Sequence, residues 1–323
     1  MRKHLPLIFI LGCLFHYSSL RAQDSTADLK NQPDSLKHSD TVDIIARMDS
    51  LLAGFKKEFR KSYFKASLGY LSNNVYLGRK DSTAIPYIIP GLSYYHRSGL
   101  YAAASFGWLA SDGYSRIDMG TIEAGYIFSA GDYDGAIIAS KYFYNSQSTN
   151  IRAEIKSSVT LENGYDFGFM RPTLNGTLNF GSKTDILATF GVEHTYYLFN
   201  DHLDLTPTVE GNAGTLNFYN NYYRKRRYTK TRKRLPPLSG VVTITGTVID
   251  PSEFRMLDWE ASIPIIYHLK HFTISFTPVY VIPLNPASIE IHKVFSLGPV
   301  TDTIRQEKLE NSFFFEAEVA YRF

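Results

Sequence analysis

The sequence predicts an all-β protein, a transmembrane antiparallel up-and-down β-barrel of twelve strands that follows a short N-terminal helix. Three observations support this fold class. From Tyr63 onward, apolar and polar residues alternate with a period of two, as in a strand with two different faces. The alternating segments are longer than the five or six residues typical of soluble strands. The chain is also rich in aromatic residues, with 23 Tyr and 22 Phe among its 323 residues.

Residues 1–22 have the organisation of a secretory signal peptide. A basic start at Arg2 and Lys3 precedes an apolar run over 5–15, and Ala22 is a small residue suited to cleavage. A lipoprotein cleavage box ending at Cys13 is the alternative. Cys13 is the only cysteine, so the mature chain is predicted to contain no disulfide framework and no cysteine-based zinc site.

Residues 23–62 are predicted to form a periplasmic linker followed by an amphipathic helix. Residues 24–40 contain no aromatic side chain and too few large aliphatic ones to bury a core. Between Val42 and Phe59, apolar residues recur at three- and four-residue spacing, which predicts a helix over 41–60. Its apolar stripe would pack on the neighbouring domain or the membrane surface, or else bind a dedicated partner.

Residues 63–323 are predicted to form the barrel itself. Short connections alternate with longer ones, which is the asymmetry of outer-membrane barrels, and an even strand count places both ends of the barrel on the periplasmic side. No apolar run reaches the roughly 20 residues that a membrane helix needs. Prolines inside several predicted strands indicate kinks or rims. The predicted strands span 63–72, 84–97, 100–110, 116–129, 133–145, 150–162, 166–180, 185–199, 203–219, 253–269, 271–285 and 311–323. The short connections are 98–99, 130–132, 163–165, 200–202 and 270; the others are 73–83, 111–115, 146–149, 181–184, 220–252 and 286–310.

The last segment, NSFFFEAEVAYRF, ends on an aromatic residue and presents Phe315, Val319, Tyr321 and Phe323 on one face. It resembles the C-terminal assembly signal of bacterial outer-membrane β-barrel proteins, and Gln23 after a cut at Ala is similar to secreted proteins of the Bacteroidota. The resemblance implies a Gram-negative outer-membrane location, an N-terminal segment in the periplasm, and insertion by the barrel-assembly machinery. It implies no activity.

The longest predicted outer loop contains eight cations within eleven residues. Because the signal peptide directs the chain out of the cytoplasm, nucleic acid is not an expected partner. The loop could bind phosphates of lipopolysaccharide or another surface polyanion, fold into the barrel as a plug, or remain a solvated loop. The eight cations are Arg224, Lys225, Arg226, Arg227, Lys230, Arg232, Lys233 and Arg234.

The polar faces of the predicted strands assign more acids than bases to the barrel interior. Such a lumen favours cationic solutes, although the same residues could form salt-bridge ladders that fill a narrow barrel. The assigned acids are Glu123, Glu154, Glu162, Glu193, Asp204, Glu210, Asp258, Glu260, Glu316 and Glu318. The assigned bases are Lys65, Arg152, Lys156, Arg171 and Arg322.

The sequence therefore favours a small channel or transporter for polar, including cationic, solutes. The alternative is a non-conducting barrel whose loop 220–240 binds surface polyanions or a partner, and an embedded lipid-modifying enzyme comes third. Outer-membrane phospholipases carry a His and a Ser two positions apart on one strand face; His16-Tyr17-Ser18 has this spacing but lies in the signal peptide. His96 has no nucleophile assigned to it, and His194 is followed by Thr195. His268 and His271 straddle a turn without an identified third metal ligand, so we expect no metal or cofactor.

Overall fold

The computed structural model describes residues 61–323, apart from 74, 81–85, 112–113, 147, 149, 223–240 and 296–299. The predicted signal peptide, linker and helix 41–60 lie outside the described residues, as does the cationic segment 224–234. Among the described residues, no helix is both long and apolar enough to cross a membrane.

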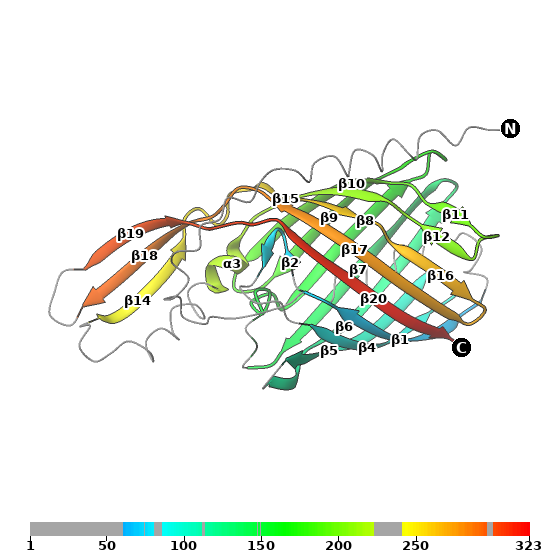
Figure 1. The fold of residues 1–323 in the computed structure, drawn as a ribbon, viewed down its shortest axis with the longest axis horizontal. Helices are drawn as coiled ribbons and strands as arrows, with labels where there is room; N and C mark the ends of the chain where they lie inside the picture. The colour runs from blue at the N-terminus through cyan, green and yellow to red at the C-terminus, as the bar shows by residue number, and fades with distance from the viewer. Residues whose placement is uncertain are drawn as a thin grey trace, which may run out of the picture. The chain divides into compact units, whose positions relative to one another are not determined.

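Twelve antiparallel strand positions follow one another around a closed barrel (Figure 1). The last strand pairs with the first, at Lys65↔Arg322, and also with its predecessor along the sheet, at Phe272↔Tyr321. This double pairing leaves no open edge, which is the condition for crossing hydrocarbon with strands. The predicted twelve-strand barrel is confirmed. Its strands are β1 (Tyr63–Leu71), β4 (Tyr87–Tyr95), β5 (Leu100–Ser111), β6 (Tyr114–Ala130), β7 (Tyr133–Tyr144), β8 (Ser157–Tyr165), β9 (Arg171–Phe180), β10 (Thr184–Glu193) with β11 (Tyr196–Leu198), β12 (Leu203–Leu205) with β13 (Thr208–Gly214), β15 (Arg255–Ser262) with β16 (Ile265–Leu269), β17 (Phe272–Pro283) and β20 (Ser312–Arg322).

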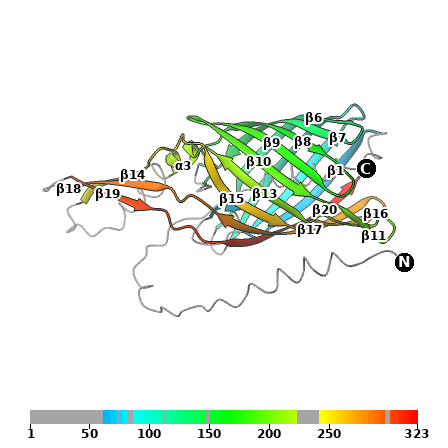
Figure 2. The same ribbon diagram turned by 90° about the horizontal axis from the view of Figure 1, so that it is seen from above.

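Side-chain alternation divides each strand into an outward apolar face and an inward buried face. On β17, Phe272, Ile274 and Phe276 are 42–48% exposed, whereas Ser275 and Thr277 are buried. Large apolar side chains are exposed in the same way on the other strands of the barrel. Figure 2 shows these strands in a second view of the barrel. An apolar exterior of this extent is expected of a surface that contacts lipid chains.

Two prolines interrupt the long strands. Pro207 lies in the break between β12 and β13, directly before Thr208. Pro264 lies in the break between β15 and β16, directly before Ile265. Proline has no backbone N–H to donate to the sheet, so the ladder breaks there while the strand direction continues.

The loops at the end opposite the short turns contain structure that the sequence did not predict. β2 (Val75–Tyr76) and β3 (Arg79–Lys80) form a hairpin, and β14 (Val241–Val248), β18 (Ser288–Phe295) and β19 (Thr301–Gln306) form a three-stranded sheet (Figure 1). Helix α3 (Asn217–Tyr222) replaces the end of the predicted strand 203–219 and the start of the predicted loop 220–252. The Asp185 carboxylate accepts hydrogen bonds from the backbone N–H groups of Asn217 (2.6 Å) and Phe218 (2.9 Å), which starts the helix.

Two predicted boundaries on either side of β8 are wrong. The strand expected from residue 150 begins at Ser157, because Asn150 starts a turn: its Oδ1 accepts the backbone N–H of Arg152 at 2.8 Å. The turn expected at 163–165 lies at 166–170 instead. Gly168, with φ of +84°, supplies the left-handed conformation there, and Asp166 Oδ1 accepts its N–H at 2.7 Å.

Candidate functional site

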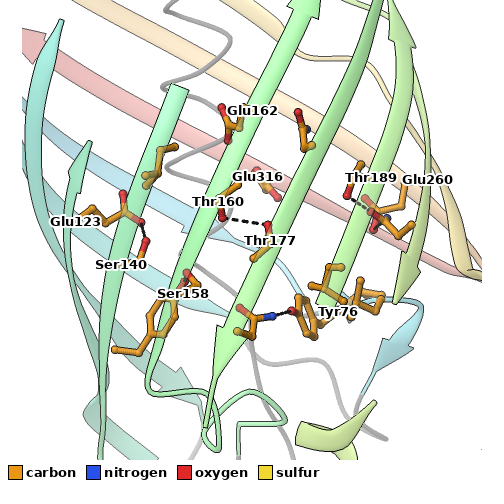
Figure 3. A pocket seen from close by; sticks show the side chains of 18 of the residues that line it. Tyr76, Glu123, Ser140, Ser158, Thr160, Glu162, Thr177, Thr189, Glu260 and Glu316 are labelled. Atoms are coloured by element: carbon orange, nitrogen blue, oxygen red, sulfur yellow. Dashed lines mark hydrogen bonds between the residues drawn. The ribbon is translucent and has the colours of Figure 1, made fainter. Parts of the chain in front are cut away.

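The barrel interior contains a cavity of about 100 Å³, which we call the chamber (Figure 3). Four carboxylates from four different strands line it: Glu123 on β6, Glu162 on β8, Glu260 on β15 and Glu316 on β20. Each occupies an inward position of its strand, so the alternation that exposes apolar residues to lipid also turns these acids inward. The chamber is also lined by Ser140, Ser158, Thr160, Asn175, Thr177, Asn179, Thr189 and Asn212.

Hydrogen bonds between neighbouring strands hold this polar wall in place. Ser140 Oγ donates to Glu123 Oε1 at 3.1 Å, and the hydroxyls of Thr160 and Thr177 lie 3.0 Å apart (Figure 3). Thr189 Oγ1 donates to Asn212 Oδ1 at 2.7 Å. The Asn212 amide in turn donates to Asp258 at 2.8 Å and to Glu260 at 3.4 Å. Each bond contributes about 1 kcal/mol, so the wall is pre-organised as a network.

The charged side chains among the described residues that line the chamber are all acidic. Among the described residues that line it, none is a lysine or an arginine. In channels generally, rings of carboxylates favour cations over anions.

The inward-facing bases lie closer to the short turns, in what we call the ion-pair layer. Arg171, directly after a turn, bonds to both Asp134 and Glu193, with Nη1–Oε1 of 2.5 Å in the second pair. Lys65 lies 3.7 Å from Glu318, both side chains being buried. The inward charges therefore lie in two places, the ion-pair layer near the short turns and the chamber.

On its other side the chamber is covered by an apolar layer of loops, which we call the cover. Tyr76 and Leu77 of the β2–β3 hairpin line the chamber directly, and the Tyr76 hydroxyl accepts a hydrogen bond from Asn179 Nδ2 at 3.0 Å. The ring of Tyr76 also meets Phe218 of α3 edge-on at 5.3 Å. The cover comprises Tyr76, Leu77, Met119, Tyr142, Ile151, Ile155, Leu187, Leu216, Phe218, Tyr219, Val248, Leu257, Ala287, Ile289 and Ile291, all buried.

One buried guanidinium, which we call the Arg79 latch, joins the hairpin to two other loops. Arg79 is 1% exposed and donates to the backbone oxygens of Leu77 (2.6 Å) and Asn285 (3.1 Å). Its Nε lies 3.5 Å from Glu307. Glu307 also accepts hydrogen bonds from the Tyr219 hydroxyl and from the Ala287 N–H (3.1 Å).

The structure places some of the predicted lumen charges in the chamber, some in the ion-pair layer, and the others elsewhere in the barrel. Glu123, Glu162, Glu260 and Glu316 line the chamber, while Lys65, Arg171, Glu193 and Glu318 belong to the ion-pair layer. Asp204 bonds to His268 Nε2 at 3.0 Å, and Asp258 to Asn212. Glu210 is paired across the sheet with Glu260, and Arg322 lies over the ring of Tyr63 at 5.3 Å.

The placement of Arg152, Glu154 and Lys156 on a strand face is wrong, because all three precede β8. Arg152 is nevertheless buried, at 2% exposure, and its guanidinium lies over the rings of Tyr76 (4.6 Å) and Tyr142 (5.2 Å). Glu154 is half-buried in the turn, and Lys156 is exposed. The local asparagine turn overrides an alternation that continues into residues 150–156.

Sequence reasoning missed Asp134, Arg79 and Glu307. Asp134 begins the inward face of β7, where Ala136 and Ile138 are apolar, so the pattern gave no sign of a polar face there. Arg79 and Glu307 lie in two loops separated by more than 200 positions, and no local pattern links them.

The described histidines support no catalytic or metal site. The expectation that His96 has no nucleophile beside it is wrong, because His96-Arg97-Ser98 has the His-X-Ser spacing and Nδ1 lies 2.8 Å from Ser98 Oγ in an exposed tight turn. Within the described part of the chain, no carboxylate or asparagine bonds to the other nitrogen of His96. His194 packs edge-on against Tyr196 at 4.6 Å. The described residues contain no group of three His, Cys, Asp or Glu residues able to hold a metal ion.

The residues of the predicted assembly signal lie on the outward face of β20 or just after it. Val319 and Phe323 are 48% and 70% exposed, and the ring of Tyr321 packs on Phe272 at 4.8 Å. Recognition by assembly machinery stays a prediction.

Known proteins resemble this chain in fold and not in sequence. No family model matches the sequence, and no curated protein matches it. Its fold is similar to those of outer-membrane porins. KdgM porin superposes with a TM-score of 0.42 at 8% identity, covering 81% of this chain and 99% of that one. NanC porin gives 0.42 at 9% identity, covering 80% and 98%. An outer membrane channel from Pseudomonas putida F1 gives 0.37 at 9% identity, covering 81% and 94%.

Similarities this distant do not indicate which solute this chain would bind or conduct. The strand pairing itself confirms the predicted closed, antiparallel barrel of twelve strands.

Proposed function

We propose that this protein is an outer-membrane channel for small polar solutes with a preference for cations. The observation that carries the proposal is the chamber, in which four carboxylates and eight hydroxyl or amide side chains face a common space without a lining lysine or arginine among the described residues. Carboxylate rings of this kind select cations, and neighbouring hydroxyls and amides replace part of a solute's hydration.

The exterior supports a membrane location. Outward residues such as Leu68 (56% exposed), Leu92 (53%) and Leu174 (61%) would be costly in water and favourable against lipid chains. Under this proposal the short turns and the N-terminal segment face the periplasm, and the cover faces outward. Lipid, lipopolysaccharide and the barrel-assembly machinery remain proposed partners.

The cover implies a closed resting state. The hairpin residues that line the chamber are held by the Arg79 latch, so movement of β2–β3 is the step that would open a path from outside. The runner-up function is a non-conducting barrel whose loop 220–240 binds surface polyanions, and the burial of the whole apolar cover favours it.

Planar-bilayer recording of the purified mature chain separates these functions. We expect weak conductance from the wild type and a clear increase in Arg79→Ala. Lys80→Ala is the matched control, because Lys80 is the next residue of the hairpin but pairs with the exposed Glu310. Deletion of 222–235 tests the plug in parallel. If none of these proteins conducts, the channel proposal is wrong and the non-conducting function stands.

A further inference from the structure

We propose that two copies of this chain pair through the free edge of the three-stranded sheet formed by β14, β18 and β19. Among the described residues, β19 ends this sheet, with β18 on one side and no strand on the other. All six of its residues, Thr301–Gln306, are exposed. Because none of them lines the chamber, the pairing and the proposed function can fail independently.

The outer side of β19 presents backbone groups that are available to another strand. The Glu307 N–H donates to Ala287 O at 2.8 Å, so the backbone of Glu307 faces β18. Successive residues of a strand direct their N–H and C=O groups to alternate sides, so those of Asp302, Ile304 and Gln306 point away from β18. Within the described part of the chain, these outward groups make no backbone hydrogen bond.

The opposite edge of the same sheet is protected, and the edge at β19 is not. On β14, the Val248 N–H donates to Asn220 Oδ1 of α3 at 3.0 Å, and the register against β18 shifts between Val241 and Thr243. A covering element and a bulge are two ways in which proteins block pairing at a sheet edge. β19 contains no proline and no lysine, and it pairs with β18 without a register shift. It can therefore accept an added strand.

A second copy of β19 fits this edge in an antiparallel register. Full use of the three outward residues sets Ile304 opposite Ile304 of the second copy, and Asp302 opposite Gln306. The three residue pairs would exchange about six backbone hydrogen bonds around a two-fold axis. Ile304 is 65% exposed and lies at the centre of this contact, so each isoleucine would cover the other. Arg305 would lie opposite Thr303, which leaves no like charges directly opposed.

Cysteine cross-linking of the detergent-purified mature chain tests both the pairing and its register. Cys13 lies in the predicted signal peptide, so Ile304→Cys adds the only thiol of the mature chain. Opposed residues of a hydrogen-bonded pair have Cα atoms about 5.5 Å apart, which is within disulfide range. We expect mild oxidation of Ile304→Cys to give about tenfold more covalent dimer than Glu290→Cys. Glu290 is the matched control because it is exposed on β18 and lies opposite Ile304 within one chain.

The register makes a second prediction for the same assay. Asp302→Cys and Gln306→Cys should form a disulfide with each other when the two variants are mixed, and little with themselves. Random collision would instead link every exposed thiol to a similar extent.

Ile304→Pro tests the pairing without a cross-link. Proline removes an N–H that faces away from β18, so the sheet keeps its own hydrogen bonds while the outer edge loses a donor. The two-fold symmetry doubles this loss, so self-association measured by sedimentation should weaken by about tenfold or more. Ile304→Val should associate like the wild type. Retained heat-modifiable migration on gels shows that the barrel of each variant is folded.

Three results would overturn the pairing. They are equal cross-linking of Ile304→Cys and Glu290→Cys, undiminished association of Ile304→Pro, and a wild-type chain that stays monomeric at every concentration. The last result is also the one expected if a different protein occupies the edge. Dimers without conductance would sink the channel and leave the pairing standing, and conductance by a strictly monomeric chain would do the reverse.

Discussion

The chamber and its cover are adjacent regions built in opposite ways. The polar wall of the chamber comes from barrel strands, and its acids are spread over β6, β8, β15 and β20. The cover is made largely of loop residues and is apolar, with Leu216 and Ala287 fully buried. In a barrel with lipid outside, the inward faces are free to be polar, so the conventional apolar core is displaced into the loops that close the mouth.

This contrast indicates which part can move. The four strands that carry the chamber acids are each hydrogen-bonded to a neighbouring strand on both sides. The cover depends on side-chain packing and on the Arg79 latch, and breaking such contacts locally leaves the barrel closed. Four substitutions test this division, in order of decreasing expected effect.

Leu216→Asp should open the cover and spare the barrel. Leu216 is fully buried among the cover residues, so a carboxylate there should destabilise the cover by about 4 kcal/mol. Bilayer recordings should show a large rise in conductance while heat-modifiable migration persists. Leu216→Met is the control. Loss of the folded barrel in Leu216→Asp would show that the two regions are not separable.

Arg171→Met should lower the stability of the barrel and leave the packing of the cover unchanged. It leaves the half-buried Asp134 and the buried Glu193 without their shared cation, at a cost of about 3 kcal/mol. Unfolding by guanidinium chloride in detergent should reach its midpoint at a lower denaturant concentration than in the wild type. Arg171→Lys should lower that midpoint less. An unchanged midpoint would mean that the ion-pair layer contributes no stability.

Gly78→Ala should strain the hairpin. The added Cβ would lie 2.7 Å from Pro283 Cβ, and Gly78 has φ of +73°. We expect a local cost of about 1–3 kcal/mol and faster hydrogen exchange in β2–β3. Gly131→Ala is the matched control, since Gly131 has φ of +65° but nothing within 4 Å. Similar exchange in both variants would rule out the contact with Pro283 as the cause.

Glu123→Gln should have the smallest effect. It keeps the shape and an acceptor for Ser140 while removing one of four negative charges. In a conducting background such as Arg79→Ala, cation preference measured as reversal potential should fall partway, and Glu290→Gln should leave it unchanged. A Glu123→Gln channel with full selectivity would place the selective step outside the chamber.

The sequence was sufficient to predict the barrel and most of the chamber. Alternation along Ser157–Tyr165 and Arg255–Ser262 places Glu162 and Glu260 inward, since a period of two fixes the face of every residue once one is known. The sequence was not sufficient to predict the cover. Arg79 meets Glu307 because of how the loops return across the mouth, and such a pairing leaves no local signal. The turn at Asn150 was also not predictable from the alternation of residues. The pattern predicts a strand from residue 150, but the hydrogen bond from the Arg152 N–H to Asn150 Oδ1 forms a turn there instead.

The central claim is that the chamber is a cation-selective path beneath a removable cover. Its most direct test is the reversal potential of Arg79→Ala in a KCl gradient, measured before and after Glu123, Glu162, Glu260 and Glu316 are all changed to Gln. We predict a reversal potential displaced toward the potassium equilibrium value, and a return toward zero once the four carboxylates are removed. Anion selectivity in Arg79→Ala, or a reversal potential that the four substitutions do not move, would contradict it.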